Sequence, residues 1–190
     1  TADTPVSDLP LATDETTLDE TQTQETETDV IEEKKVAVLV EEAQGFTEEL
    51  SVDAGITPGS PLSFIDNAFD GFANPADVRE EKISEMRGLS ERCGQGEQKA
   101  CEFMKESYKR YQRYADNFER DVSPEQREEA IRSSEAIRGV AIREIAQNMP
   151  AGEKDEFVKE IVLGEKDIVT AAEIADKIQS LCMELSKLDP

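Results

Sequence analysis

The stretch GITPGSPLSFIDNAFDGFANPADVREE, residues 55–81, decides the fold class, because it contains the start signal of a helix twice. Ser60 and Asn74 are small polar residues of the kind favoured at a helix N-cap, and a proline directly follows each of them. Proline suits the first helical position, where its missing N–H leaves no hydrogen bond unmade and its fixed φ is already helical. Apolar residues at helical spacing then follow the first pair: Leu62, Ile65, Phe69 and Phe72. The stretch therefore predicts two consecutive helices.

The same signal occurs a third time, at Ser123 and Pro124, where Gln126 completes a capping box. The remaining chain has helical periodicity throughout. We expect helices near residues 77–91, 97–120, 124–148, 153–163 and 170–188. Four glycines are placed at joints between them: Gly94, Gly96, Gly152 and Gly164. These observations predict an all-α fold, a bundle of five to six helices built from helical hairpins and preceded by an acidic, threonine-rich flexible or extended segment.

Two of these helices have a marked pattern of apolar residues. The helix at 170–188 has a seam, expected to belong to the core, that is formed by Ile174, Ile178, Leu181, Leu185 and Leu188, with Thr170 and Glu173 as its capping box. The helix at 97–120 has an aromatic series, interpreted as core and rim, of Phe103, Tyr108, Tyr111, Tyr114 and Phe118. Gly139, inside the helix at 124–148, is interpreted as a close approach of two helices.

Composition divides the chain into three parts. Residues 1–29 contain nine threonines and nine acidic residues without a periodic apolar face, so we expect a disordered tail or spacer. Residues 30–54 form a short amphipathic segment and a linker, and residues 55–190 form the helical domain. The net charge is −23, and 13 of these excess negative charges lie in residues 1–50.

The segment at 30–54 allows two conformations. Val36, Leu39, Val40 and Ala43 recur at the spacing of a helix, which we favour. The run VAVLV, which includes Val38, is also rich in β-branched residues and suits a strand. An extended apolar segment beside a flexible tail could add to a neighbouring subunit, so Val36, Val38, Leu39 and Val40 are a candidate assembly segment.

Charge and residue types weigh against several functions. A strongly negative field repels phosphate backbones and anionic membrane surfaces, so neither nucleic acid nor a membrane is an expected partner. The chain has no histidine, which removes the usual general base and the commonest transition-metal ligand. It also lacks a glycine-rich phosphate loop and a zinc signature, so we expect a protein without enzymatic activity, without catalytic residues and without a cofactor.

The three cysteines fall into a pair and a single residue. Cys93 and Cys101 lie at the two ends of an expected turn between helices, where two cysteines can come within bridging distance. We favour a disulfide, which suits a secreted protein, over two small buried thiols. Cys182 lies beside the apolar seam at 174–188, and is either buried there or paired with a cysteine beyond residue 190.

Calcium binding deserves a test because carboxylates are abundant. Asp66, Asp70, Gly71 and Asp77 match positions 1, 5, 6 and 12 of an EF-hand loop. Ala68 occupies position 3, however, and the phenylalanines of this stretch fit a helix better than a calcium loop. We therefore expect no defined metal site, and at most weak association of Ca²⁺ or Mg²⁺ with the acidic surface.

From Gly55 onward the chain resembles an uncharacterised family, a domain of unknown function in extracytoplasmic proteins of archaea and bacteria. The resemblance rests on GITPGSPLSFID and its Thr-Pro-x-Ser-Pro-x-x-Phe motif, formed by Thr57, Pro58, Ser60, Pro61 and Phe64. It extends through VSPEQREEAIRSSEAIR and the last 23 residues. It implies a secreted or envelope-associated helical domain, often part of a longer chain, and it implies no activity.

These patterns converge on a non-enzymatic module that is extracellular or associated with the cell envelope. We expect it to act through contact with a protein partner, through self-association, or as a structural element. Two alternatives remain open: a subunit of an extracellular polymer that docks through residues 30–50, and an acidic surface protein that binds divalent cations weakly. The first residue is Thr1 and the last two are Asp-Pro, so we expect a longer natural chain.

Overall fold

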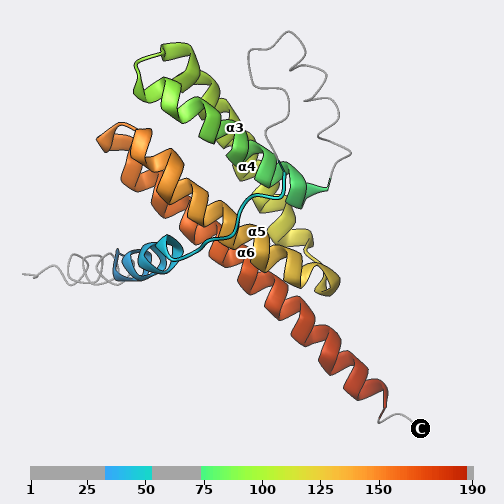
Figure 1. Cartoon of the computed structure of the whole chain (residues 1–190). Coiled ribbons are helices and arrows are strands. Elements are labelled where there is room, and N and C mark those ends of the chain that lie inside the picture. Colours follow the sequence, from blue (N-terminus) through green and yellow to red (C-terminus); the bar gives the residue numbers. More distant parts are fainter. Residues whose placement is uncertain (1–32, 53–73, 188–190) are drawn as a thin grey trace, which may run out of the picture. The chain divides into compact units, whose positions relative to one another are not determined.

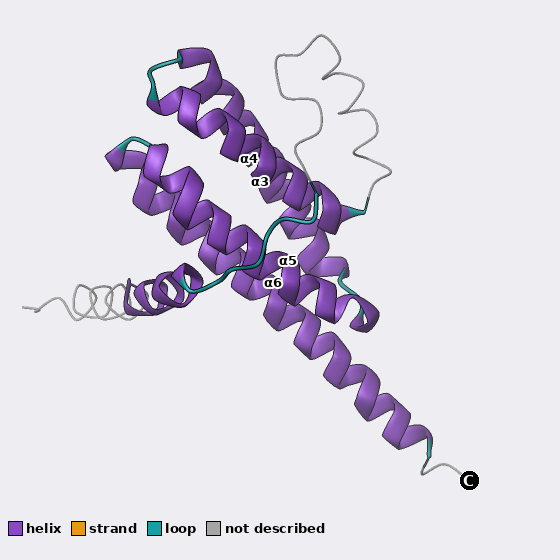
Figure 2. Ribbon diagram, in the orientation of Figure 1, coloured by secondary structure: helices purple, strands orange, loops and turns teal. Residues whose placement is uncertain are grey.

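The computed structural model describes residues 33–52 and 74–187. Residues 33–44 form a helix. The later elements are α3 (Pro75–Gly94), α4 (Gln98–Asp121), η2 (Pro124–Gln126), α5 (Arg127–Val140), η3 (Ala141–Ile145), η4 (Ala146–Asn148) and α6 (Ala151–Ser186). Figure 2 shows helices and loops, without a strand in the described ranges. The all-α prediction is confirmed.

The helices pack as two hairpins. α3 packs mainly against α4, and α5 packs mainly against α6, while α4 also contacts α6 and α3 contacts α5 (Figure 1). Chain contacts divide the protein into Thr1–Lys34 and Lys35–Pro190, and every contact discussed below lies within the second unit. The four long helices therefore enclose one core.

Two of the three predicted proline-initiated helix starts lie in the described residues, and both are confirmed. The Asn74 side chain accepts a hydrogen bond from the backbone N–H of Ala76, and Pro75 is the first residue of α3. At the second start, the Ser123 N–H donates to the Gln126 side chain at 3.0 Å, as a capping box requires. The start at Ser60 and the whole Thr57–Phe64 motif lie outside the described residues.

The C-terminal part of the chain differs from the prediction. We expected two helices, at 153–163 and 170–188, with a joint at Gly164, but α6 is a single helix of 36 residues. The Thr170 hydroxyl donates to the carbonyl of Lys166 within this helix, so the capping box predicted at Thr170 and Glu173 is wrong. A glycine inside a helix costs only about 1 kcal/mol relative to alanine, which core packing on both sides of Gly164 outweighs.

The core is formed by apolar side chains from α3, α4, α5, η3 and α6. Its largest fully buried members are Ile83, Met86, Leu89, Ile137, Ile145, Ile161 and Ile168. The aromatic series of α4 is core and rim, as predicted: Tyr111 and Phe118 are buried, and Phe103 and Tyr108 are partly buried against the core. At Gly139 the nearest neighbour of an added Cβ would be the Arg143 side chain of its own helical continuation.

The segment before α3 also packs on this core. Residues 33–44 are helical, which is the favoured of the two conformations, and Leu39 and Val40 are partly buried against the core. Phe46 lies under the guanidinium of Arg138 at 4.6 Å, and its carbonyl accepts a hydrogen bond from Arg143. These contacts attach residues 39–46 to α5 and η3.

Candidate functional site

The turn between α3 and α4 contains the predicted disulfide. Cys93 and Cys101 are bonded, with their Cα atoms 4.8 Å apart. Gly96 has φ of 93°, a left-handed conformation that glycine adopts at little cost, and this allows the tight reversal. The exposed pair Arg92 and Glu97 spans the same turn, and its ion pair lowers the pKa of Glu97. The disulfide therefore fixes the end of the first hairpin.

A buried polar network joins all four long helices. Arg79 of α3 and Glu165 of α6 form an ion pair at 3.0 Å, and both side chains are fully buried. Glu165 also accepts hydrogen bonds from the hydroxyls of Tyr111 in α4 and Ser134 in α5, at 2.6 and 2.7 Å. Arg79 donates to Ser133 at 2.6 Å and lies 4.5 Å from the centre of the Phe118 ring.

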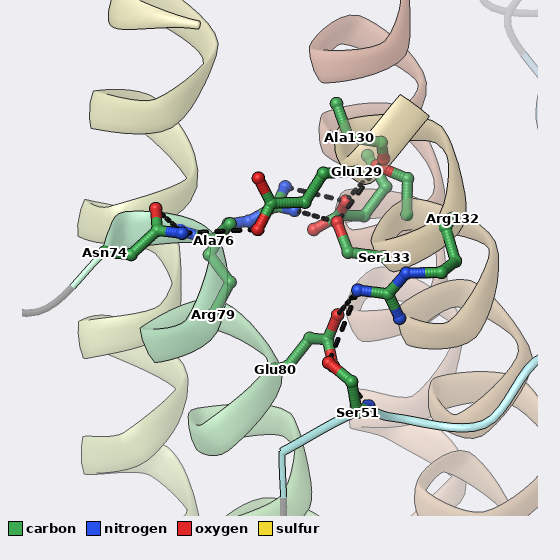
Figure 3. A network of polar contacts seen from close by, with 11 residues as sticks. Ser51, Asn74, Ala76, Arg79, Glu80, Glu129, Ala130, Arg132 and Ser133 are labelled. Atoms are coloured by element: carbon green, nitrogen blue, oxygen red, sulfur yellow. Dashed lines mark hydrogen bonds and ion pairs between the residues drawn. The ribbon is translucent and has the colours of Figure 1, made fainter. Parts of the chain in front are cut away.

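Further buried charges of α3 have partners of their own. Lys82 donates to Glu85 at 3.0 Å, and Glu85 accepts from the Ser107 hydroxyl at 2.7 Å. Figure 3 shows that Glu80 lies between Ser51 and Arg132. The Ser51 N–H and hydroxyl donate to Glu80 at 2.6 and 2.7 Å. This contact attaches the end of the 46–52 segment to α3.

These networks are suited to a structural role, in which they hold the helices together. Every carboxylate described in them accepts bonds from fixed donors, and burial raises the pKa of Tyr111 well above its ordinary value of 10, so its hydroxyl stays a donor. Sequence reasoning missed these residues, because the local sequence does not show which charges of a helix have partners on other helices. One signal was present: Glu165 lies among Ile161, Val162, Ile168 and Val169 on an otherwise apolar face.

A groove of about 410 Å³ lies between α4 and α6. Met86, Met104, Met149 and Phe157 contribute apolar lining. Several of its polar groups bond to one another: Tyr108 donates to Glu160, and Lys105 pairs with Glu153 at 3.0 Å. Burial, followed by the Glu160 carboxylate, raises the pKa of Tyr108, so this phenol is a hydrogen-bond donor and not a base.

The acidic residues in the described ranges form no cluster of three or more that could hold a metal ion. Of the four residues compared with an EF-hand loop, Asp77 lies in the first turn of α3, and the other three lie outside the described residues. Asp77 there is a favourable charge for the helix dipole.

The most unusual surface is the C-terminal third of α6. The four described residues of the predicted seam are exposed by 51–65%: Ile174, Ile178, Leu181 and Leu185. We name these four residues the α6 seam. The prediction that this seam belongs to the core is wrong, and Cys182 beside it is exposed and free. These large aliphatic side chains recur at helical spacing and form an exposed apolar face.

The apolar face of α6 changes sides along the helix. Between residues 157 and 172 the buried side chains face the bundle, among them Ile161, Ile168 and Ala172. At about 100° per residue, the α6 seam lies roughly half a turn around the helix from that face. The bundle-facing side of the same stretch is polar there, with Asp176 near Arg127 at 3.9 Å and Gln179 bonded to Glu125 at 3.1 Å. The α6 seam therefore faces away from its own bundle.

The predicted assembly segment, at residues 36–40, is less exposed than the α6 seam. Leu39 and Val40 pack partly against the core of their own chain, Val36 is half-buried, and Val38 is 64% exposed. Most of its apolar face is thus already in use within the chain. Figure 1 shows the α6 end, in contrast, extending beyond the α3–α5 part of the bundle.

Comparisons with known proteins returned no match to this chain among protein-family models, curated proteins or solved structures. None of the helices in the described ranges is both long and apolar enough to cross a bilayer. The functional interpretation consequently rests on the chain's own residues.

Proposed function

We propose that this protein is a non-enzymatic helical module that acts through protein–protein contact, and that the α6 seam is the contact surface. The observation that carries this proposal is the exposure of four large aliphatic side chains on one face of α6, turned away from the core that the same helix helps to form. Moving such a side chain from full exposure to full burial gains roughly 1.5–3 kcal/mol, and these four, at 51–65% exposure, have about half of that still to gain. A bound helix would recover much of that free energy.

We further propose that the module works outside the cytoplasm, in an extracellular or cell-envelope setting, and belongs to the extracytoplasmic family that the Thr57–Phe64 motif resembles. The disulfide between Cys93 and Cys101 supports an oxidising compartment, because structural disulfides persist mainly there. The acidic residues 1–29 would serve as a spacer, and their charge keeps nucleic acid away.

Cys182 provides a built-in probe for the contact. This thiol is exposed and lies immediately beside Leu181, so a partner on the α6 seam would shield it. Its alkylation rate with a bulky maleimide should be compared between the protein in its native cells and the purified protein at high dilution. We expect slower alkylation in the cells.

Two variants decide what such slowing means. Ile178→Asp places a charge in the α6 seam, and in the cells it should raise the alkylation rate of Cys182 to the rate of the purified protein at high dilution. Met183→Asp is the matched control, because Met183 is exposed to a similar extent, 53% against 56%, on another face of the same helix turn. Equal rates in cells and at dilution, or equal effects of the two variants, would overturn the proposal.

A further inference from the structure

We infer that the partner of the α6 seam is a second copy of this chain, bound antiparallel to the first. The inference rests on the proposed function and names the occupant of the same surface.

The α6 seam has the spacing of a coiled coil. Ile174 and Leu181 occupy d positions of a heptad, and Ile178 and Leu185 occupy a positions. In an antiparallel pair related by a twofold axis between residues 179 and 180, each a residue meets a d residue of the other copy. Ile178 would then face Leu181, and Leu185 would face Ile174, which gives four aliphatic core layers.

The charges beside the seam complement one another only in this orientation. Lys177 and Glu184 occupy the two g positions, and neither has an ion-pair partner within 4 Å among the described residues. Antiparallel helices place g against g, so Lys177 of each copy would face Glu184 of the other, making two equivalent ion pairs. On the opposite flank, the e positions hold Ala175 and Cys182, which are small enough for close approach.

A parallel pair would lose this complementarity. Parallel helices place g against e, so Lys177 would face Cys182 of the second copy, and the two opposite charges would not meet. The seam is aliphatic and tolerates either direction, so the charged flank selects the antiparallel one.

The bundle leaves room for the second copy. Residues Asp176 and Gln179 face α5 and η2, on the side of α6 opposite to the seam. In the antiparallel pair each bundle would lie on the outer side of its own α6, and Ala172, the last buried residue of one α6, would lie level with residue 187 of the other. The two bundles therefore occupy opposite ends of the paired segment.

The paired surface is small. Eight half-exposed aliphatic side chains would bury roughly 800 Å² of apolar area, which lies below the range of stable interfaces and within that of transient ones. We therefore expect a reversible dimer with a dissociation constant of the order of micromolar to tens of micromolar, weakened by salt because of its two exposed ion pairs.

Sedimentation equilibrium of the full chain over a range of concentrations tests this inference. We expect the unsubstituted chain to show a monomer–dimer equilibrium, Ile178→Asp to weaken it at least about 30-fold, and Met183→Asp to leave it within about twofold. Lys177→Glu should weaken the dimer by about tenfold at low salt, and the added substitution Glu184→Lys should restore it. Circular dichroism checks that each variant keeps its helix content.

Three results would overturn the inference. They are a chain that stays monomeric throughout, a dimer that Ile178→Asp does not weaken, and a failure of Glu184→Lys to rescue Lys177→Glu. The failure of the inference is distinguishable from that of the proposed function. A monomer in the centrifuge whose Cys182 is still shielded in cells would mean that a different protein covers the α6 seam.

Discussion

Arg79 and Glu165 lie 86 residues apart in the sequence and form an ion pair at 3.0 Å with both side chains fully buried. This contact joins the first hairpin to the second. Because Glu165 also accepts from Tyr111 and Ser134, one carboxylate has partners on the three other long helices. The way the helices pack is thereby specified by polar as well as apolar contacts.

Removing one member of this pair should strongly destabilise the fold. Glu165→Ala leaves the Arg79 charge buried without a carboxylate, which typically costs about 3–5 kcal/mol. Urea denaturation followed by circular dichroism measures the free energy of unfolding. The double variant Arg79→Met with Glu165→Leu should recover part of the loss, since it removes both charges from the core.

The exposed pair Lys105–Glu153 is the control for that experiment. Its side chains are 58% and 46% exposed, so Lys105→Ala should cost less than about 1 kcal/mol. If Glu165→Ala costs no more than Lys105→Ala, the buried network does not hold the helices together as described.

The disulfide should stabilise the α3–α4 hairpin. Cys93 and Cys101 are eight residues apart, and closing a loop of that size in the unfolded chain corresponds to about 2–3 kcal/mol. We expect a reducing agent to lower the free energy of unfolding by this amount. The double variant Cys93→Ala with Cys101→Ala should start at the reduced value and be insensitive to the reducing agent. An equal response in both chains would contradict the assignment.

Two glycines inside helices should respond differently to alanine. A Cβ at Gly164 meets nothing within 4 Å, so Gly164→Ala should stabilise the protein by about 1 kcal/mol. A Cβ at Gly139 would lie 2.6 Å from Nη1 of Arg143, which donates to the carbonyl of Phe46. Gly139→Ala should therefore stabilise the protein less than Gly164→Ala. Because it displaces Arg143 from the carbonyl of Phe46, it should also speed proteolysis of the 46–52 segment. Thermal unfolding and limited proteolysis measure the two effects, and equal behaviour of the variants would contradict this account.

Stability should fall at alkaline pH through Tyr111. Burial, and then the Glu165 carboxylate, raise the pKa of Tyr111 well above 10 in the folded chain. The contribution of Tyr111 to the free energy of unfolding is complete below about pH 10. It is lost above that pH, where the phenol ionises in the unfolded chain but not in the folded one. The stability advantage of the unsubstituted chain over Tyr111→Phe should therefore shrink between about pH 8 and pH 11. A constant difference in urea denaturation would mean that Tyr111 is not held neutral.

Local chemistry in the sequence predicted a good part of the fold. Asn74 before Pro75, and Ser123 before Pro124, are helix starts because a cap and a proline act on their own backbone neighbours. The Cys93–Cys101 disulfide could also be predicted from the local sequence, since it closes a turn between adjacent helices. Each of these features depends on residues close in sequence.

Features that depend on distant residues were not predicted. The Arg79 charge can be buried because it contacts Ser133 and Glu165, which lie 54 and 86 residues away in the sequence. Gly164 was assigned to a joint because a sequence does not show that core packing continues on both sides of it. The α6 seam was assigned to the core because periodicity shows that a face is apolar, without showing which surface covers it.

The most direct test of the central claim is photocrosslinking from the edge of the α6 seam in the native cells. A benzophenone amino acid in place of Lys177 should form an adduct with another protein chain, and the same group in place of Met183 should form little or none. Mass spectrometry then identifies the captured chain, which we expect to be a second copy. Adducts from neither position, or equal adducts from both, would contradict the claim that the α6 seam is a docking surface.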